Sequence, residues 1–327
     1  MMRSIWYDGM MGLVTGDALG CPAEFCTREE LRERGGVTAM EGYGTYQMPP
    51  GTWTDDSSMA LATLDSLRNR QAAVPKDIMD CFAAWKAQGS YTPFGRAFDI
   101  GRTCSEAIEA YQKSGDWHTC GRADEHANGN GALMRILPVC LFLIRQEQRK
   151  ELDEEQALQT VQQVTALTHG HRRAGIASGL YYFMVRSIVQ NREKGSLKEL
   201  LQAGLDAGFR YYDKNPENQE ELKHFARIRS LDAAEKIPEE EIFSSGYVID
   251  TIEAAVWCLL TTDSFRSCLL KAVNLGDDTD TTAAVAGGPA GLYYGGENIP
   301  AEWRNALQKR EWIEGLIGAM EARDAER

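Results

Sequence analysis

Apolar residues recur at every third or fourth position along most of this 327-residue chain, and this spacing constrains its fold more than any other feature. Such a period places apolar side chains on one face of an α-helix, whereas a half-buried β-strand needs strict alternation. Runs of alternating β-branched residues are scarce. The pattern predicts an all-α protein, with helices over residues 57–70, 152–167, 172–191, 196–209, 217–230, 248–262, 264–273 and 280–294.

The rest of the chain gives no sign of a domain boundary. Residues 35–53 are rich in Gly, Pro and Tyr and predict a long loop with at most a short hairpin. Gly12, Gly16 and Gly20 follow one another at helical spacing, which suits close packing between helices. There is no repeat with a period of about 20–50 residues and no low-complexity tract. We therefore expect one compact multi-helix domain over residues 1–327.

Charge and composition exclude several classes of protein. A net charge of −13 argues against a nucleic-acid or anionic-membrane partner, because both kinds of binding rely on an excess of Lys and Arg. No uncharged stretch approaches the roughly 18 residues that span a bilayer. Asp8 and Asp17 interrupt the apolar N-terminal run, unlike in a signal peptide. The eight cysteines form no C-x-x-C pair and are expected to be reduced, so a cytoplasmic protein is predicted.

Two acidic clusters, far apart in the sequence, each stand at the start of a predicted helix. Residues 54–58 read Thr-Asp-Asp-Ser-Ser, and residues 277–282 read Asp-Asp-Thr-Asp-Thr-Thr. Capping of free N–H groups explains one acidic residue per helix, but explains two or three poorly. Neighbouring carboxylates repel each other unless a cation neutralises them, and hard divalent ions such as Mg²⁺ prefer oxygen ligands. The negative charges of four acids, Asp55, Asp56, Asp278 and Asp280, would balance two divalent ions. Helix capping by these residues is the alternative interpretation.

The second cluster also fits a different motif. Asp278-x-Asp280-x-Thr282 matches the nucleophile motif of haloacid-dehalogenase-like phosphatases. That motif needs an apolar β-strand before it and a long Rossmann-like chain after it. Residues 269–275 have a helical pattern instead, and only about 45 residues follow Thr282. The phosphatase interpretation is therefore disfavoured.

Two other segments are candidates for binding an anionic ligand. Residues 128–135, Asn-Gly-Asn-Gly-Ala-Leu-Met-Arg, form a glycine-rich turn before an apolar helix. Small residues let backbone N–H groups approach a ligand, and a helix N-terminus favours pyrophosphate, although an ordinary turn is the simpler interpretation. His169 and His171 lack a cysteine partner and make a poor zinc pattern. For His169 we expect a place beside an anionic ligand or at a helix end.

Taken in order, these segments resemble the ADP-ribosylglycohydrolase family. The resemblance covers about residues 9–300 and rests on motifs at 16–24, 54–56, 129–135, 168–169 and 276–281. The Asp-Asp-Thr-Asp-Thr block in the last of these is the most specific. The resemblance implies a compact orthogonal all-α fold, with a centre of two Mg²⁺ ions, or Mn²⁺, at the bottom of a cleft.

The resemblance also implies roles for individual residues. The metal ligands would be Thr54, Asp55, Asp56, Asp278, Asp280 and Thr281. The catalytic residues would be Glu24, Asp99, Asp55 and Asp56. The substrate would be bound by Gly129, Asn130, Gly131, Ala132, Met134, His169, Ser245, Gly246 and Tyr247. Asp99, in the segment 91–101, resembles the aspartate beside the scissile bond in the arginine-directed branch, which includes the dinitrogenase reductase-activating glycohydrolase.

The activity that the resemblance implies is Mg²⁺-dependent hydrolysis of the bond linking ADP-ribose to a modified protein side chain. Arginine is favoured, because a guanidinium leaving group would pair with Asp99. The partner would be an ADP-ribosylated protein or small molecule. Hydrolysis of serine-linked or small-molecule ADP-ribose conjugates is the first alternative. A non-catalytic relative that only binds ADP-ribose is the second, and it is disfavoured because all six metal positions are intact.

Overall fold

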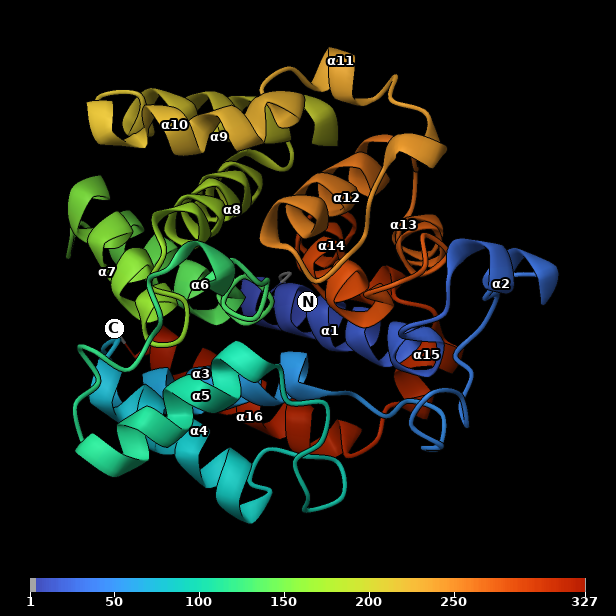
Figure 1. Ribbon diagram of the computed structural model, residues 1–327, viewed down its shortest axis with the longest axis horizontal. Helices are drawn as coiled ribbons and strands as arrows, with labels where there is room; N and C mark the ends of the chain where they lie inside the picture. Colours follow the sequence, from blue (N-terminus) through green and yellow to red (C-terminus); the bar gives the residue numbers. More distant parts are fainter. Residues whose placement is uncertain (1–3, 327) are drawn as a thin grey trace.

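The structure is a computed structural model that describes residues 4–326 (Figure 1). Within this range all regular secondary structure is helical, apart from two isolated bridges that pair Arg122 with His169 and Gly129 with Tyr247. The all-α prediction is confirmed. The α-helices are α1 (Ile5–Gly20), α2 (Arg28–Glu33), α3 (Asp55–Arg70), α4 (Pro75–Gln88), α5 (Arg102–Ser114), α6 (Leu137–Gln148), α7 (Glu154–Ala166), α8 (Arg172–Asn191), α9 (Leu197–Tyr212), α10 (Gln219–Leu222), α11 (Leu231–Ala234), α12 (Val248–Leu260), α13 (Phe265–Val273), α14 (Thr279–Tyr294), α15 (Ala301–Ala306) and α16 (Arg310–Ala325).

Every predicted helix except 217–230 coincides with one α-helix, to within three residues at each end. Local capping explains several of these boundaries. Ser196 accepts a hydrogen bond from the backbone N–H of Glu199, and the Glu199 side chain accepts one from the backbone N–H of Ser196. This reciprocal capping box satisfies two N–H groups that the helix itself leaves free, and it begins α9 where the apolar pattern begins.

The prediction of a single helix over 217–230 is wrong. This stretch consists of α10 flanked by two short 3-10 helices. Its buried side chains, Leu222, Phe225 and Ile228, follow one another at every third position. Phe225 and Ile228 lie in the 3-10 helix Lys223–Ile228, whose three residues per turn keep them on one face, and Leu222 precedes them at the end of α10.

Close contact between α1 and α14 organises the centre of the molecule (Figure 1). Gly12, Gly16 and Gly20 lie so near to α14 that a Cβ atom on any of them would overlap its backbone. Their predicted role in close helix packing is confirmed. Thr279 at the start of α14 donates a hydrogen bond from its hydroxyl to the Gly20 carbonyl over 2.8 Å. The end of α1 and the start of α14 therefore lie side by side.

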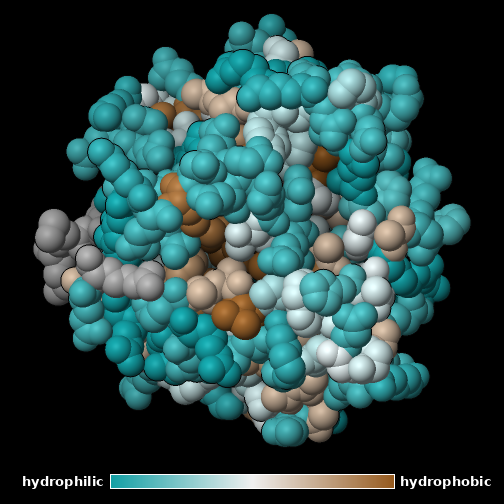
Figure 2. Space-filling model, turned by 90° about the vertical axis from the view of Figure 1, so that its left-hand side faces the viewer, coloured by the Kyte–Doolittle hydropathy of each residue, from teal (hydrophilic) through white to brown (hydrophobic). Residues whose placement is uncertain are grey.

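The other helices surround this pair. In Figure 1, α3, α4, α5 and α16 lie on one side of α1, and α8, α9, α12 and α13 lie on the other. The buried apolar side chains form one continuous cluster that extends from Trp6 to Met320. Figure 2 shows a face that is covered mainly by hydrophilic residues, with apolar ones gathered near its middle. None of the helices within residues 4–326 has the length and apolar character that crossing a membrane requires.

The close packing of α1 on α14 makes a testable prediction. Gly16→Ala forces the two backbones apart, and we expect it to lower the free energy of unfolding by about 2 kcal/mol or more. Gly318→Ala on α16 is the control, because a Cβ there meets nothing within 4 Å. It should leave stability unchanged or raise it by up to about 1 kcal/mol, through helix propensity. Equal effects of the two substitutions in urea denaturation would contradict this account of the packing.

Candidate active site

Asp17, near the end of α1, holds the start of α3. Its buried carboxylate accepts hydrogen bonds from the backbone N–H groups of Thr54 and Ser57, each over 2.9 Å, and from the Ser57 hydroxyl over 2.5 Å. The residues at the N-cap positions of α3 and α14, Thr54 and Asp278, make no capping hydrogen bond with their own side chains. Side-chain capping by the N-cap residue therefore does not account for Thr54 or Asp278.

The two acidic clusters meet at the starts of α3 and α14. The Thr54 hydroxyl lies 3.2 Å from a carboxylate oxygen of Asp280, although the two residues are 226 positions apart. The Thr281 hydroxyl donates to Asp56 over 3.3 Å. The same Thr54 hydroxyl is also 3.0 Å from Asp17, but its one proton can satisfy only one acceptor. Where the two clusters meet, there are therefore more hydrogen-bond acceptor oxygens than donor groups.

Four buried carboxylate oxygens have no hydrogen-bond partner within residues 4–326. They belong to Glu24, Asp56, Asp278 and Asp280, with one oxygen from each. Burial, followed by the charge of Asp99, raises the pKa of Glu24 to about 9. Burial and then neighbouring acids also raise the pKa of Asp56 and of Asp280. Unpaired carboxylates in a buried site are costly. The donor set fits hard divalent cations, which take oxygen ligands and supply the missing positive charge.

Residues from three parts of the chain could hold such a cation. Glu24, Asp99 and Asp280 each offer a carboxylate oxygen, and these three oxygens lie within 4.8 Å of one another. Of the six predicted metal ligands, this group contains only Asp280. The other two members, Glu24 and Asp99, are predicted catalytic residues, and the resemblance also places Glu24 near the metal and the ribose. The possible donors therefore extend beyond the predicted ligand set.

A cavity of about 340 Å³ is lined by many of the predicted site residues. These are Glu24, Asp55, Asp99, Gly129, Asn130, Gly131, Met134, His169, Gly246, Asp278 and Thr281. The remaining predicted residues do not contribute to its lining: Thr54, Asp56, Ala132, Ser245, Tyr247 and Asp280. The cavity thus brings together the acidic clusters, Asp99, the glycine-rich turn and His169, which are separate in the sequence.

Hydrogen bonds hold the glycine-rich turn against the start of α12. The backbone N–H of Asn130 donates to the Gly246 carbonyl over 3.0 Å, and that of Val248 donates to the Asn128 carbonyl over 3.0 Å. The side-chain amide of Asn130 donates to Asp278 over 2.8 Å. The turn is therefore tied both to α12 and to the second acidic cluster.

Three residues predicted to bind substrate are placed differently from that expectation. The Ser245 hydroxyl donates to Asp250 on α12 over 2.5 Å. The Tyr247 hydroxyl accepts a hydrogen bond from Arg173 over 2.9 Å. Ala132 is buried inside the turn. Within residues 245–247, only Gly246 reaches the cavity wall, because the side chains of its two neighbours are engaged with other residues.

Tyr46, in the long loop 35–53, is a site residue that sequence reasoning missed. Its hydroxyl donates a hydrogen bond to Asp99. Its ring makes edge contacts with Phe98, at 5.3 Å between ring centroids, and with Phe25, at 6.5 Å. Asp99 itself has a φ of 54°, in the left-handed region that non-glycine residues seldom adopt. Tyr46 therefore anchors an unusual backbone position at the cavity wall.

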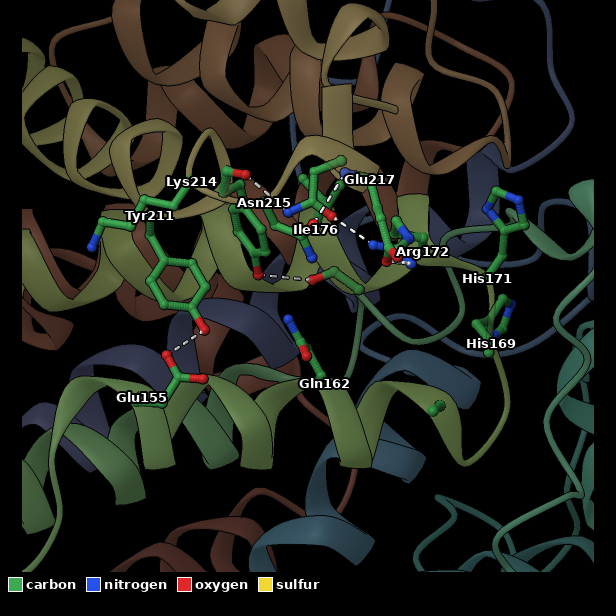
Figure 3. A pocket seen from close by; sticks show the side chains of 15 residues that line it. Glu155, Gln162, His169, His171, Arg172, Ile176, Tyr211, Lys214, Asn215 and Glu217 are labelled. Carbon is green, nitrogen blue, oxygen red and sulfur yellow. Dashed lines mark hydrogen bonds and ion pairs between the residues drawn. The ribbon is translucent and has the colours of Figure 1, made fainter. Parts of the chain in front are cut away.

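A second cavity, of about 620 Å³, lies among α7, α8 and α9 (Figure 3). Figure 3 shows Tyr211 and Glu155 toward one end and His169 and His171 at the other. Its polar side chains are largely paired: the Tyr211 hydroxyl donates to Glu155 over 2.9 Å, and Arg172 contacts Glu217 over 2.7 Å. Although it is larger, this cavity lacks the unpaired carboxylates of the first one. His169 lines both cavities.

Residues 4–327 match the sequence model of the ADP-ribosylglycohydrolase family. The chain belongs to this family. It is 32% identical over 312 residues to the ADP-ribosylarginine hydrolase Tri1 of Serratia proteamaculans (strain 568), covering 94% of this chain and 76% of that protein. It is 30% identical over 301 residues to the ADP-ribosyl-[dinitrogen reductase] glycohydrolase of Rhodospirillum rubrum, covering 92% and 89%. A solved structure titled "ADP-ribosylglycohydrolase-related protein complex" aligns with a TM-score of 0.76 at 32% identity, covering 97% of each chain.

Membership of this family confirms the predicted resemblance. It also confirms the prediction that the chain is a hydrolase. The phosphatase alternative is excluded by the same finding and by the fold. The element before Asp278 is the helix α13, whereas the phosphatase motif requires a β-strand there. The order of motifs along the chain, rather than any single motif, identified the family correctly.

The crowding of carboxylates in this ADP-ribosylglycohydrolase predicts a pH dependence when divalent cations are removed. Glu24 has a pKa of about 9 in the folded chain, above its ordinary value of 4.5, so between these values only the unfolded chain releases the proton. The contribution of Glu24 to stability is therefore present below about pH 4.5 and is lost as the pH rises toward 9. In EDTA, Glu24→Gln should gain stability relative to the unsubstituted protein as the pH rises, measured by urea denaturation. A difference that stays constant with pH would contradict this.

Proposed function

We propose that this ADP-ribosylglycohydrolase removes ADP-ribose from modified arginine side chains of proteins, using two bound Mg²⁺ ions, or Mn²⁺. The observation that carries the proposal is the position of Asp99 at the cavity wall, with a carboxylate oxygen near those of Glu24 and Asp280. The printed names of two relatives, an ADP-ribosylarginine hydrolase and an ADP-ribosyl-[dinitrogen reductase] glycohydrolase, support the substrate class. The eight free thiols fit a reducing compartment such as the cytoplasm.

The cations in this proposal would be held by Thr54, Asp55, Asp56, Asp278, Asp280 and Thr281, with Glu24 and Asp99 close by. Support comes from the four carboxylate oxygens that lack partners and from the raised pKa of several of these acids. Bound Mg²⁺ ions would act as Lewis acids that polarise oxygen atoms of the substrate. The positive charge would also allow all of these acids to be ionised together.

The glycine-rich turn and His169 would bind the diphosphate and the neighbouring ribose. Gly129 and Gly131, which carry no side chain, line the cavity together with Asn130, whose side-chain amide is bonded to Asp278. Met134 and Gly246 complete this side of the wall. A protein with a net charge of −13 binds an anion most readily through such backbone groups. No nucleic-acid or membrane partner is proposed.

The proposed hydrolysis breaks the bond between the ribose carbon and the guanidinium nitrogen and forms a bond from that carbon to the oxygen of a water molecule, while one proton of the water passes to the leaving nitrogen. Glycoside cleavage passes through a transition state with positive charge on the sugar, which a nearby carboxylate stabilises. Glu24 and Asp99 are the carboxyl groups available at the cavity wall to stabilise this charge and to move protons. Asp99 would also pair with the cationic guanidinium before the bond breaks.

The arginine assignment is tested by assaying ADP-ribosyl-arginine, ADP-ribosyl-serine peptides and O-acetyl-ADP-ribose side by side, with Mg²⁺ and with EDTA. We expect release of ADP-ribose from the arginine substrate only when Mg²⁺ is present. Asp99→Asn should slow that release by on the order of 100-fold or more, because it removes a charged group at the reacting bond. Asp232→Asn is the control, since its side chain is 81% exposed on α11. Preferential cleavage of either other substrate, or full activity in EDTA, would contradict the proposal.

The contact between Tyr46 and Asp99 gives a second test. Tyr46→Phe removes only the hydroxyl that donates to Asp99 and should lower kcat for the arginine substrate by about 10-fold. The matched control is Tyr91→Phe. It removes a hydrogen bond of 2.9 Å from the Tyr91 hydroxyl to Asp65, and neither residue lines the cavity. ADP-ribose affinity should be unaffected by both substitutions, because neither hydroxyl belongs to the proposed ADP-ribose contacts. A kcat equal to that of the control would show that Tyr46 does not position Asp99.

A further inference from the structure

A buried arginine without an acidic partner ends the glycine-rich segment 128–135. Arg135 is fully buried, and none of the ion pairs within residues 4–326 involves it. Its guanidinium carbon lies 4.7 Å from the centre of the Phe82 ring, and its Nε and Nη1 atoms have no hydrogen-bond partner among these residues. A buried cation is normally paired with a carboxylate. Such an exception needs a reason.

The remaining nitrogen of Arg135 begins a chain of hydrogen bonds that leads to the cavity. Its Nη2 donates to the Thr168 hydroxyl oxygen over 2.8 Å, and that oxygen lies 2.8 Å from Nδ1 of His169. His169 is buried and lines the cavity beside the glycine-rich turn. Three side chains, one from the turn before α6 and two from the segment between α7 and α8, thus form one path from a buried charge to the site.

The direction of each hydrogen bond follows from the chemistry of the three groups. Arginine has no acceptor atom, so Arg135 must donate to Thr168. The hydroxyl proton of Thr168 then needs an acceptor, and Nδ1 of His169 is a strong one. The Cys104 thiol, which the same hydroxyl also approaches, is a weak one. With Nδ1 accepting, a neutral imidazole must carry its proton on Nε2.

The other ring nitrogen faces the glycine-rich turn. An added Cβ on Gly129 would lie 3.4 Å from Nε2 of His169, and one on Gly131 would lie 3.5 Å from it. Both glycines line the cavity. Burial, and then the charge of Arg135, lowers the pKa of His169 to about 3, so the ring is neutral at physiological pH. An Nε2–H group is therefore directed toward the segment proposed to bind diphosphate.

We propose that Arg135 and Thr168 are positioning residues that fix His169 as its Nε2–H tautomer and so make it a hydrogen-bond donor to an anionic diphosphate oxygen. The identity of the ligand in this inference rests on the proposed function. The position of the proton on His169 is a property of the protein without ligand. Arg135, without an acidic partner, also places positive charge at the end of the glycine-rich segment, in a chain whose net charge is −13. This positive charge favours the binding of an anion at the turn, whereas the neighbouring carboxylates repel an anion.

The proton arrangement is tested by NMR of the full chain labelled with ¹⁵N-histidine, without added ligand or divalent cation. The chain has five histidines, and His169→Gln identifies the signals of His169. We expect His169 to show a protonated Nε2 and an unprotonated Nδ1, with no titration between pH 5 and 8. A protonated Nδ1 in the unsubstituted protein would overturn the inference, and this measurement depends on no variant that alters Thr168.

Substitutions at Thr168 test the cause. Thr168→Val removes the hydroxyl with little change of shape and should give a mixture of tautomers or the opposite one, whereas Thr168→Ser should keep the original. The matched control is Thr165→Val, since the buried Thr165 hydroxyl donates only to the Val161 carbonyl over 2.8 Å. An unchanged tautomer in a folded Thr168→Val protein would overturn the role of Thr168.

Calorimetric titration with ADP-ribose separates the tautomer of His169 from the role of His169 in binding. Loss of a directed donor to a charged oxygen should weaken binding by about tenfold in Thr168→Val, with affinity restored in Thr168→Ser. Unaltered ADP-ribose affinity in Thr168→Val, combined with a changed tautomer, would overturn the role of His169 as a donor. If the unsubstituted protein binds no ADP-ribose, the proposed function fails, while the NMR result still decides whether Arg135 and Thr168 fix the ring.

Discussion

The direct backbone contact between α1 and α14 is the constraint on which the site depends. Gly12, Gly16 and Gly20 leave no side chain between the two helices, so the end of α1 lies against the start of α14. Asp17 of α1 can then cap α3, which brings the first acidic cluster to the second. Residues from opposite ends of the chain meet because three glycines allow two helices to approach closely.

The cavity has two sides with opposite electrostatic character. On one side, buried carboxylates repel one another and leave oxygen atoms without partners, which is unfavourable unless cations are bound. On the other side lie the glycine-rich turn and a neutral His169, which Thr168 connects to the charge of Arg135. Under the proposed function, the ribose hydroxyls of ADP-ribose would face the first side and its diphosphate would face the second. The arrangement matches the chemistry of one ligand along its length.

The sequence predicted most of the helices and most of the cavity lining, because both rest on local patterns. Helical periodicity placed seven helices, and the motifs led to acids and glycines that the fold brings together. Tyr46 escaped prediction because its role depends on a contact across 53 positions, from a loop without a pattern. Ser245 and Tyr247 were assigned by motif, but only packing decides that their side chains turn to Asp250 and Arg173.

The central claim is that acids from both ends of the chain share divalent cations, and one measurement tests it most directly. Crystals grown in Mn²⁺ would be examined by anomalous diffraction at the manganese absorption edge. The account predicts two ordered ions, bound by acids at the start of α3 together with acids at the start of α14. Ordered ions that contact only one of the two clusters, or no ordered ion in a site where Asp56 and Asp280 remain unpaired, would contradict it.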